Sequence, residues 1–493
     1  MHALSFGQSN FELLPGSSEL IYDESRGVHK LLGGANFIYQ GNTMYCDSMY
    51  YYDASKLLKA FGNVHIQKTD NVNLFCDSLH YNGNSGQSKM FGHVRAIDSE
   101  YKLTTDTLDY NTRSQQGVYR YGGRIEHLIN GEVLTSRVGY FYPNAKNFFF
   151  RGNVKYKSPE LNMTTDTLQY KYSEQRTYFF GPTNIITKDA IIYCESGWYN
   201  TQTEEGKLMK KAKINQGAKF INGDTLKYNP SSKTSEAFGS VFYTDTTDKV
   251  SFFGNYAFIN DSLKYSYITK NAMITKYQPS DTIYMTADTL FNQNDSLDNR
   301  IYTLGYHNVK IFSNTMQSVA DSMHYSRKDE YIELLNNPII WAKNGEMKGD
   351  SMRIYLNDST INRIYVKNRA SIIMEVDSGL YYNQIAGTEI NAYFKENDLY
   401  RATTIGNAQT IFYPTEEVKT DTTFVIKRMG MNRLYASELK VYLDSGEVTG
   451  VTYFQQPDGV FYPMDKIRED EKKVANFNLK FALRPKSVSD LMD

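Results

Sequence analysis

The sequence predicts an all-β protein built as a long antiparallel stack of repeats, and three observations support this fold class. Aromatic residues make up 14% of the chain, with 41 Tyr among them, and such residues favour strands over helices. A short motif recurs at intervals of 29 or 30 residues from residue 18 to residue 224. Turn-forming clusters divide each unit, so every unit consists of two extended passes joined by two reversals.

The recurring motif is Asp-Ser/Thr-Leu/Met, followed in most copies by a Tyr two residues after the Leu or Met. Full copies begin at Asp47, Asp77, Asp106, Asp166, Asp224, Asp261, Asp288, Asp321 and Asp350, and weaker copies begin at Ser18, Ser136, Glu195, Gly387 and Ala436. After residue 224 the intervals become irregular, which indicates insertions. The chain therefore contains about 14 repeats of ~30 residues.

A second motif lies about half a period from the first, as in Gly62-Asn63-Val64, Gly92-His93-Val94 and Gly152-Asn153-Val154. A glycine inside a strand marks a bend. Polar residues follow both the Leu/Met column and the Val/Ile column, so alternation turns both columns inward. The predicted inward residues are Val64, Leu79, Val94, Leu108, Ile125, Val154, Leu168, Leu226, Val241, Leu263, Leu290, Val309, Met323 and Met352.

Strict alternation would also bury the Asp of each motif, which is costly for an unpaired carboxylate. We therefore expect the Asp at a bend or bulge, with its side chain accepting backbone N–H groups. Cys46, Cys76 and Cys194 each precede the motif, where other units have small residues. Their odd number and their spacing fit neither a disulfide framework nor a metal site, so we expect small packing residues and no reactive thiols.

Signals for catalysis, metal binding or a cofactor are missing from the sequence. The motifs of zinc proteases, α/β-hydrolases, phosphate loops and dinucleotide sites do not occur, so we expect no catalytic residue, no metal, no cofactor and no enzyme. A net charge of -1 argues against a nucleic-acid partner. No apolar run reaches the roughly 18 to 20 residues of a membrane-spanning helix. Paired carboxylates brought together by the fold stay open as an alternative.

The repeats resemble those of the OstA family, the periplasmic lipopolysaccharide-transport proteins, and in particular the large OstA-like proteins of Bacteroidetes-type Gram-negatives. The resemblance covers roughly residues 18 to 460. It implies a β-taco, a V-shaped jelly roll of two facing sheets, whose inward columns bind the acyl chains of lipopolysaccharide. It also implies a periplasmic protein, associated with the outer membrane, that bridges the two membranes. Its partners would be lipopolysaccharide and other transport proteins that add to its edge strands.

The expected domains are an N-terminal tail at 1–17, which resembles the end of a signal peptide, the repeats at 18–463 and a charged C-terminal tail at 464–493. We expect a solvated tail, although a docking segment is the alternative. Within the repeats, a break near 228–261 and an insertion at 414–432 stand out, so the number of troughs, one or two, stays open. The rival hypothesis is a parallel β-helix, as in carbohydrate-active or adhesin-like surface proteins, which would need shorter rungs.

Overall fold

The structure is a computed structural model that describes residues 11–17, 19–68, 72–142, 147–279, 281–297, 299–357, 360–396, 398–419, 424–444 and 447–492. The chain divides into two compact units, residues 1–231 and 232–493. The described residues contain strands and short 3-10 turns but no α-helix. Of the predicted N-terminal tail at 1–17, only residues 11–17 are described. They include strand β1 (Phe11–Leu13).

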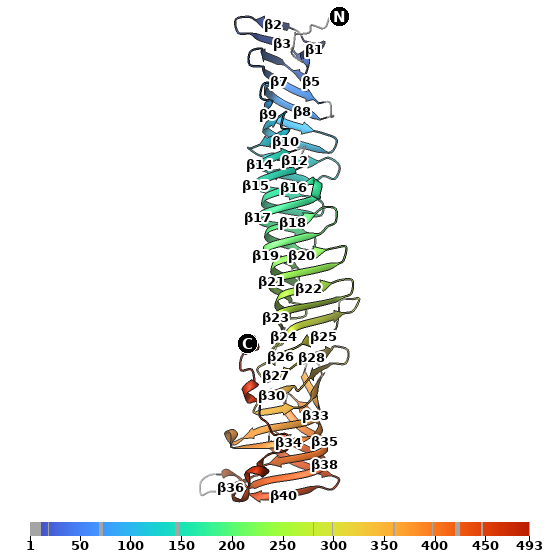
Figure 1. Cartoon of the computed structure of the whole chain (residues 1–493), viewed down its shortest axis with the longest axis vertical. Coiled ribbons are helices and arrows are strands. Elements are labelled where there is room, and N and C mark those ends of the chain that lie inside the picture. Colours follow the sequence, from blue (N-terminus) through green and yellow to red (C-terminus); the bar gives the residue numbers. More distant parts are fainter. Residues whose placement is uncertain are drawn as a thin grey trace. The chain divides into compact units, whose positions relative to one another are not determined.

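Among its described residues, unit 1 contains strands β1 to β20 and the 3-10 turn η2 (Figure 1). They are β1 (Phe11–Leu13), β2 (Glu19–Asp23), β3 (Val28–Leu32), β4 (Ala35–Tyr39), β5 (Asn42–Cys46), β6 (Ser48–Tyr52), β7 (Leu57–Gln67), β8 (Asn73–Asn82), β9 (Gln87–Ile97), β10 (Tyr101–Asn111), β11 (Gln116–Tyr119), β12 (Gly123–His127), β13 (Val133–Ser136), β14 (Val138–Tyr142), β15 (Asn147–Lys157), β16 (Leu161–Lys171), η2 (Tyr172–Glu174), β17 (Arg176–Thr187), β18 (Ile191–Asn200), β19 (Gly206–Gln216) and β20 (Lys219–Asn229).

Unit 2 contains strands β21 to β40 and five 3-10 turns among the described residues. They are β21 (Thr234–Asp245), β22 (Val250–Asn260), β23 (Tyr265–Tyr277), β24 (Thr282–Asn294), β25 (Arg300–Tyr306), β26 (Val309–Phe312), β27 (Met316–Ala320), β28 (Ser322–Ser326), β29 (Tyr331–Leu335), β30 (Ile339–Ala342), β31 (Gly345–Lys348), β32 (Ser351–Asn357), β33 (Thr360–Val376), η3 (Asp377–Gly379), β34 (Tyr381–Lys395), β35 (Asp398–Phe412), β36 (Thr415–Lys419), β37 (Phe424–Arg428), β38 (Gly430–Asp444), β39 (Glu447–Phe454), β40 (Asp458–Pro463), η4 (Met464–Lys466), η5 (Glu469–Lys472), η6 (Phe481–Leu483) and η7 (Ser489–Leu491).

Within each unit, successive passes pair antiparallel with their chain neighbours. Strand β8, for example, pairs along its length with β7 on one side and β9 on the other. Strand β10 pairs with β9 and, on its other side, with β11 and then β12, so these two short strands are halves of one interrupted pass. The prediction of an antiparallel all-β fold is confirmed, and the parallel β-helix is wrong, because a β-helix pairs its strands in parallel.

Each long pass bends at its middle. Between β7 and β8 the register skips from Phe61 to Val64, which leaves Gly62 and Asn63 as a two-residue bulge. Both bulge residues have positive φ, 73° for Gly62 and 48° for Asn63. A Cβ on Gly62 would lie 2.1 Å from Oδ2 of Asp47. Only glycine combines this backbone angle with such a close approach, which explains why the second motif of the repeat contains it.

The Asp of the repeat lies beside this bulge, on the outer side of the bend. The backbone N–H of Asp47 donates to the carbonyl oxygen of Gly62 at 2.9 Å. The carboxylate is exposed and accepts the side-chain amide of Asn63. The expected bend position is therefore confirmed. The expected backbone partners of the carboxylate are corrected here, because the neighbouring pass places an amide side chain within reach.

The bends divide each unit into two facing sheets. Wall A is the half of each pass that carries the Leu/Met column, and wall B is the half that carries the Val/Ile column. Val64 pairs with Cys76 in wall B, while Leu79 pairs with Ala60 in wall A. Residues directly opposite in a sheet share a face, so Cys76 faces inward beside the bend. The three cysteines are free and at most 6% exposed, which confirms their expected packing role at the narrow vertex.

Two sequence assignments are corrected. Leu263 is 64% exposed, because its Asp-Ser-Leu copy lies in the turn between β22 and β23, where the Leu263 N–H donates to Oδ1 of Asn260 at 2.9 Å. The copy that begins at Ser136 is shifted by one residue. Ser136 occupies the small inward position, and Arg137 occupies the position of the Asp, with its N–H donating to the Gly152 carbonyl at 2.9 Å.

The C-terminal segment, residues 464–492, packs against unit 2, so the expectation of a solvated tail is wrong. Val474 is 3% exposed and joins a cluster with Ile411 and Met431. Further along, Arg484 Nε donates to Gln317 Oε1 at 2.8 Å, and Thr286 Oγ1 donates to the Leu491 carbonyl at 3.1 Å. The residues of unit 2 that this segment contacts lie on the outer side of wall B, since each alternates along its strand with a residue that points inward. The segment covers the outer face of that wall.

The predicted insertion at 414–432 contains the hairpin of β36 and β37, and its residues 420–423 lie outside the described residues. The side chain of Arg428 fixes the base of this hairpin, because Nε and Nη2 donate to the two carboxylate oxygens of Asp377 at 2.9 and 3.0 Å. A bidentate pair of this kind gives a defined geometry. The hairpin is therefore anchored to η3 and does not interrupt the pairing of β35 with β38.

Candidate functional site

The predicted groove residues line the interior near the bends, with one exception. Twelve of the fourteen are at most 6% exposed, Ile125 is partly exposed, and Leu263 lies outside the interior. Val94 is 0% exposed and Leu79 1%. These columns therefore form a close-packed floor at the vertex between the walls, and a ligand would have to contact residues farther from the bend.

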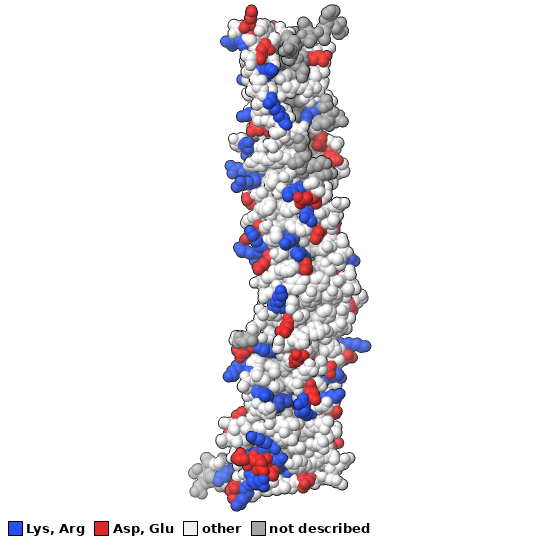
Figure 2. All heavy atoms as spheres, viewed as in Figure 1, with Lys and Arg blue, Asp and Glu red and all other residues white. Residues whose placement is uncertain are grey.

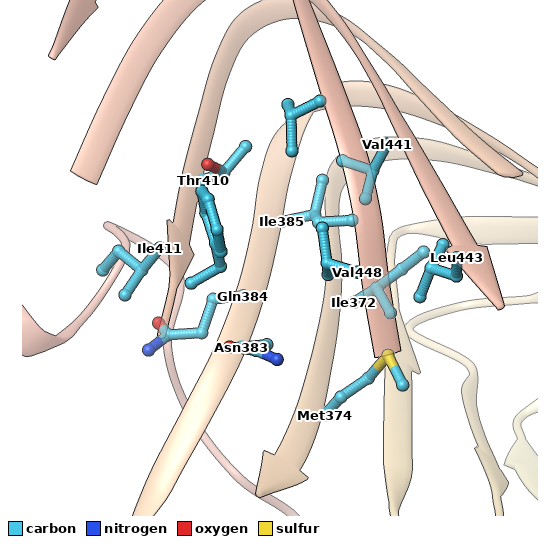
Figure 3. Close-up of a pocket in the computed structure, with 12 residues that line it drawn as sticks. Ile372, Met374, Asn383, Gln384, Ile385, Thr410, Ile411, Val441, Leu443 and Val448 are labelled. Atoms are coloured by element: carbon cyan, nitrogen blue, oxygen red, sulfur yellow. The ribbon is translucent and has the colours of Figure 1, made fainter. Parts of the chain in front are cut away.

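The described interior cavity of unit 2 is small. This cavity, drawn in Figure 3, has a volume of about 20 Å³ and lies between the two walls. Ile372 and Ile385 line it from wall B, and Val441 and Leu443 line it from wall A. A space of this size holds about one water molecule. An acyl chain could enter here only if the walls moved apart.

In unit 1, a row of inward isoleucines is partly exposed. Four isoleucines pair side by side across four consecutive strands, Ile185 with Ile192, Ile192 with Ile214, and Ile214 with Ile221. They share a face with the buried Thr183, and all four are partly exposed. We call Ile185, Ile192, Ile214 and Ile221 the isoleucine ladder. It forms the part of wall B that lies farther from the bends.

Wall A completes this region with aromatic and small residues. Tyr199 and Tyr228 are 40% and 46% exposed, and both pair with Gly206. They share a face with Gly197 and Leu226, both buried. The inward surface formed by the isoleucine ladder and these two tyrosines is the candidate site, which we call the lane. Its apolar walls can hold a hydrocarbon chain but offer no group for bond chemistry.

A buried tyrosine bridges the two walls at a level of unit 1 that precedes the lane in the sequence. Tyr119 is fully buried, and its hydroxyl lies 2.5 Å from Ser136 Oγ on the opposite wall. An added Cβ would lie 2.5 Å from the ring of Tyr119 at Gly123 and 2.4 Å from it at Gly139. These two glycines therefore leave the space that the ring of Tyr119 occupies. Burial raises the pKa of Tyr119 to about 12. A neutral side chain therefore bridges the two walls at this level.

The sequence reasoning missed the isoleucine ladder. It followed only the columns beside the bends, whereas Ile185 and Ile214 lie two residues beyond Thr183 and Ala212 in the same strands. Extending the alternation by one inward position would have found them. Their partial exposure could not be read from the sequence, because it depends on which side chains face them from wall A.

The described residues give no sign of a metal centre or of a membrane-spanning helix. They contain no group of three or more His, Cys, Asp and Glu placed to hold a metal ion. In the same part of the chain, no helical segment has the length and the apolar character needed to traverse a bilayer. On the face drawn in Figure 2, acidic and basic residues are interspersed, and such mixing does not favour a polyanion.

Comparisons with known proteins give a match to a family model and weak likenesses to solved structures. Among solved structures, LptH from Pseudomonas aeruginosa, described as the LptA-homologous periplasmic component of a lipopolysaccharide transport device, is 16% identical. The match covers 22% of this chain and 84% of that one with a TM-score of 0.21, too low to carry an argument. No curated protein matches the chain. A family model described as OstA-like protein matches residues 17–166. Over these residues the chain is therefore similar to the OstA-like proteins.

Proposed function

We propose that the chain is a lipopolysaccharide-transport protein that shields lipid acyl chains in the lane of unit 1. The observation that carries the proposal is the partly exposed isoleucine ladder on the inner face of wall B. Each methylene group that leaves water for such a surface contributes about 0.8 kcal/mol. Binding of this kind needs shape and apolar surface and no catalytic group. The lipid class rests on the OstA-like match at residues 17–166.

The predicted groove residues take a more limited role in this proposal. The buried Val and Leu columns, such as Val154 and Leu168, support the lane from below. Direct lipid contacts fall on the ladder and on Tyr199 and Tyr228, which lie farther from the bends. At the small cavity of unit 2, lipid would enter only if wall A and wall B separated.

The wider role follows from the resemblance of the repeats. A periplasmic protein of this kind, associated with the outer membrane, would bridge the inner and outer membranes during outer-membrane assembly. Other transport proteins would add strands to its ends. Among the described residues, β39 and β40 each pair with β38 alone, and unpaired strand edges accept additional strands. The exposed β40 is the edge that we propose for such a partner.

Photo-crosslinking tests the lane directly. A photoreactive phenylalanine analogue replaces Ile192 or Ile214, which face the lane, and in matched controls it replaces Tyr193 or Lys213, the next residues of the same strands, which face outward. With purified lipopolysaccharide, we expect crosslinks from the two inward positions and background from the two outward ones. Equal crosslinking from both faces would contradict the proposal.

A substitution provides a second readout. Ile214→Glu places a carboxylate at a partly exposed position of the lane, where it opposes an apolar ligand at a modest cost to folding. Lys213→Glu makes a larger change of charge on the outer face of the same strand. We expect lipopolysaccharide binding to fall about tenfold or more in Ile214→Glu, because a charge next to hydrocarbon costs at least the ~1.4 kcal/mol that this factor represents. Unchanged binding in Ile214→Glu would count against the lane.

A further inference from the structure

One bend of unit 1 reverses the charge of the repeat. At the other bends described above, an Asp lies beside the bulge, as Asp47 does beside Gly62. Arg137 takes this position beside Gly152, whose added Cβ would meet Arg137 Cβ at 3.2 Å. The backbone hydrogen bonds are equivalent, at 2.9 Å in both cases. The fold therefore accepts a guanidinium at a point where it usually holds a carboxylate.

Because Arg137 stands where other bends have an Asp, several hydrogen-bond donors around this bend have no described carboxylate beside them. The amides of Asn63 and Asn308 donate to the carboxylates of Asp47 and Asp288. Asn153 occupies the same bulge position, with a φ of 51°, but its neighbour is Arg137. Among the described residues, no carboxylate lies within ion-pair distance of Arg137 or of Lys155.

These donors surround an open recess. It has a volume of about 580 Å³, and Arg120, Arg137, Asn153 and Lys155 line it. The recess exists because the pass is interrupted between β11 and β12, where the 77% exposed Tyr121 turns away from the sheet. Arg120 Nε lies 3.7 Å from Asp109 Oδ2, a distance that is long for a charge-assisted hydrogen bond. Three cationic side chains thus face one space.

We propose that this recess binds a phosphate group. A guanidinium offers paired N–H donors that match phosphate oxygens, an ammonium adds a compact charge, and an amide adds a neutral donor. Arg137 and Lys155 are exposed and face away from the interior, so the recess and the lane open on different sides of the sheet. The proposal is therefore independent of lipid binding in the lane. Because the site is open to solvent, its affinity falls with added salt.

The phosphate could belong to a lipid headgroup or to a soluble compound, and two probes separate these sources. Inorganic phosphate is titrated into the full chain by calorimetry at low salt. Flotation then measures binding to vesicles of phosphatidylglycerol and, as a reference, of phosphatidylcholine. Arg137→Asp restores the usual residue of the repeat, Lys155→Gln removes the ammonium, and Lys213→Gln removes an outward lysine elsewhere on wall B. Circular dichroism checks that each variant is folded.

We expect Arg137→Asp to weaken binding about tenfold or more, because one charge-assisted contact to an anion is lost and a repulsive one is gained. Lys155→Gln weakens it less, and Lys213→Gln leaves it unchanged. Binding of inorganic phosphate supports a soluble source, and Arg137-dependent binding to phosphatidylglycerol vesicles alone supports a headgroup. The proposal is overturned if neither probe binds, if Arg137→Asp binds like the wild type, or if Lys213→Gln loses as much as Lys155→Gln.

Discussion

The side-chain amide of Asn63 donates to both carboxylate oxygens of Asp47, at 3.2 and 3.0 Å, across the outer side of one bend. The two residues come from neighbouring passes and are 16 positions apart in the sequence. Asn308 and Asp288 repeat this contact in unit 2 at 3.1 and 3.2 Å. The bond joins two features that recur at the bends of this chain, the left-handed bulge and the carboxylate beside it.

Substitutions at Asn63 separate the backbone contribution of the bulge from the hydrogen bond. Asn63→Gly removes the bond but suits the φ of 48°, so we expect a loss of about 1 kcal/mol or less in unfolding free energy. Asn63→Ala removes the same bond and adds roughly 1 kcal/mol of left-handed strain. Guanidinium unfolding followed by circular dichroism measures both variants. Equal midpoints would show that the backbone angle contributes nothing.

Alanine at Gly62 and at Gly152 provides a matched pair. Both glycines have nearly the same φ, 73° and 77°. An added Cβ lies 2.1 Å from Asp47 Oδ2 at Gly62 but 3.2 Å from Arg137 Cβ at Gly152. We expect Gly62→Ala to be more destabilising by about 1 kcal/mol or more, since strain of this kind costs on the order of 1 to 3 kcal/mol. If Asp47→Ala does not relieve Gly62→Ala in the double variant, the carboxylate is not the obstacle.

The three cysteines are expected to be unreactive in the folded protein. Burial raises the pKa of the Cys46 and Cys76 thiols to about 12 and that of Cys194 to about 11. At pH 8 the reactive thiolate of Cys46 is therefore populated on the order of one part in ten thousand. Iodoacetamide labelling followed by mass spectrometry should give slow labelling in buffer and fast labelling in guanidinium. Fast labelling of the folded chain would contradict this expectation.

The same shifts predict that stability falls at alkaline pH. The ordinary thiol pKa of 9.0 applies to the unfolded chain, so above pH 9 the unfolded state loses protons that the folded state retains up to about pH 12. Folding then binds protons, and the free energy of unfolding decreases as pH rises through this window. Replacing Cys76 with Ser should reduce the slope of stability against pH between 9 and 11. An unchanged slope would assign the effect to other groups, such as Tyr39, whose pKa burial raises to about 12.

Removing the C-terminal segment should expose Trp341. This residue is 0% exposed, and its Nε1 donates to Glu346 Oε2 at 2.9 Å. The same oxygen accepts the Lys480 N–H of the C-terminal segment at 2.8 Å. Trp198 is the other tryptophan of the chain, so Trp198→Phe isolates the signal of Trp341. We expect truncation after residue 463 to shift the fluorescence emission to longer wavelength and to lower the melting temperature of unit 2.

A single substitution tests the hydrogen bond to Glu346 separately from the truncation. Lys480→Pro removes the N–H that reaches Glu346 and forces the φ of this residue from -123° toward about −65°, but it keeps the apolar residues of the segment. A red shift in the truncated chain that is absent in this variant would indicate that the apolar cover matters more than the hydrogen bond. An emission that is unchanged by truncation would contradict the docked segment altogether.

The sequence by itself determined the local features of this protein. The period, the antiparallel passes, the bends at Gly62 and Asp47 and the inward direction of Val64 and Leu79 follow from turn chemistry and alternation, which act within a few residues of the chain. Only the tertiary structure decided that the isoleucine ladder is partly exposed, that Leu263 lies in a turn, and that residues 464–492 cover a wall. These outcomes depend on which side chains meet across passes that are distant in sequence, and alternation within one pass contains no information about the partner that fills the space opposite.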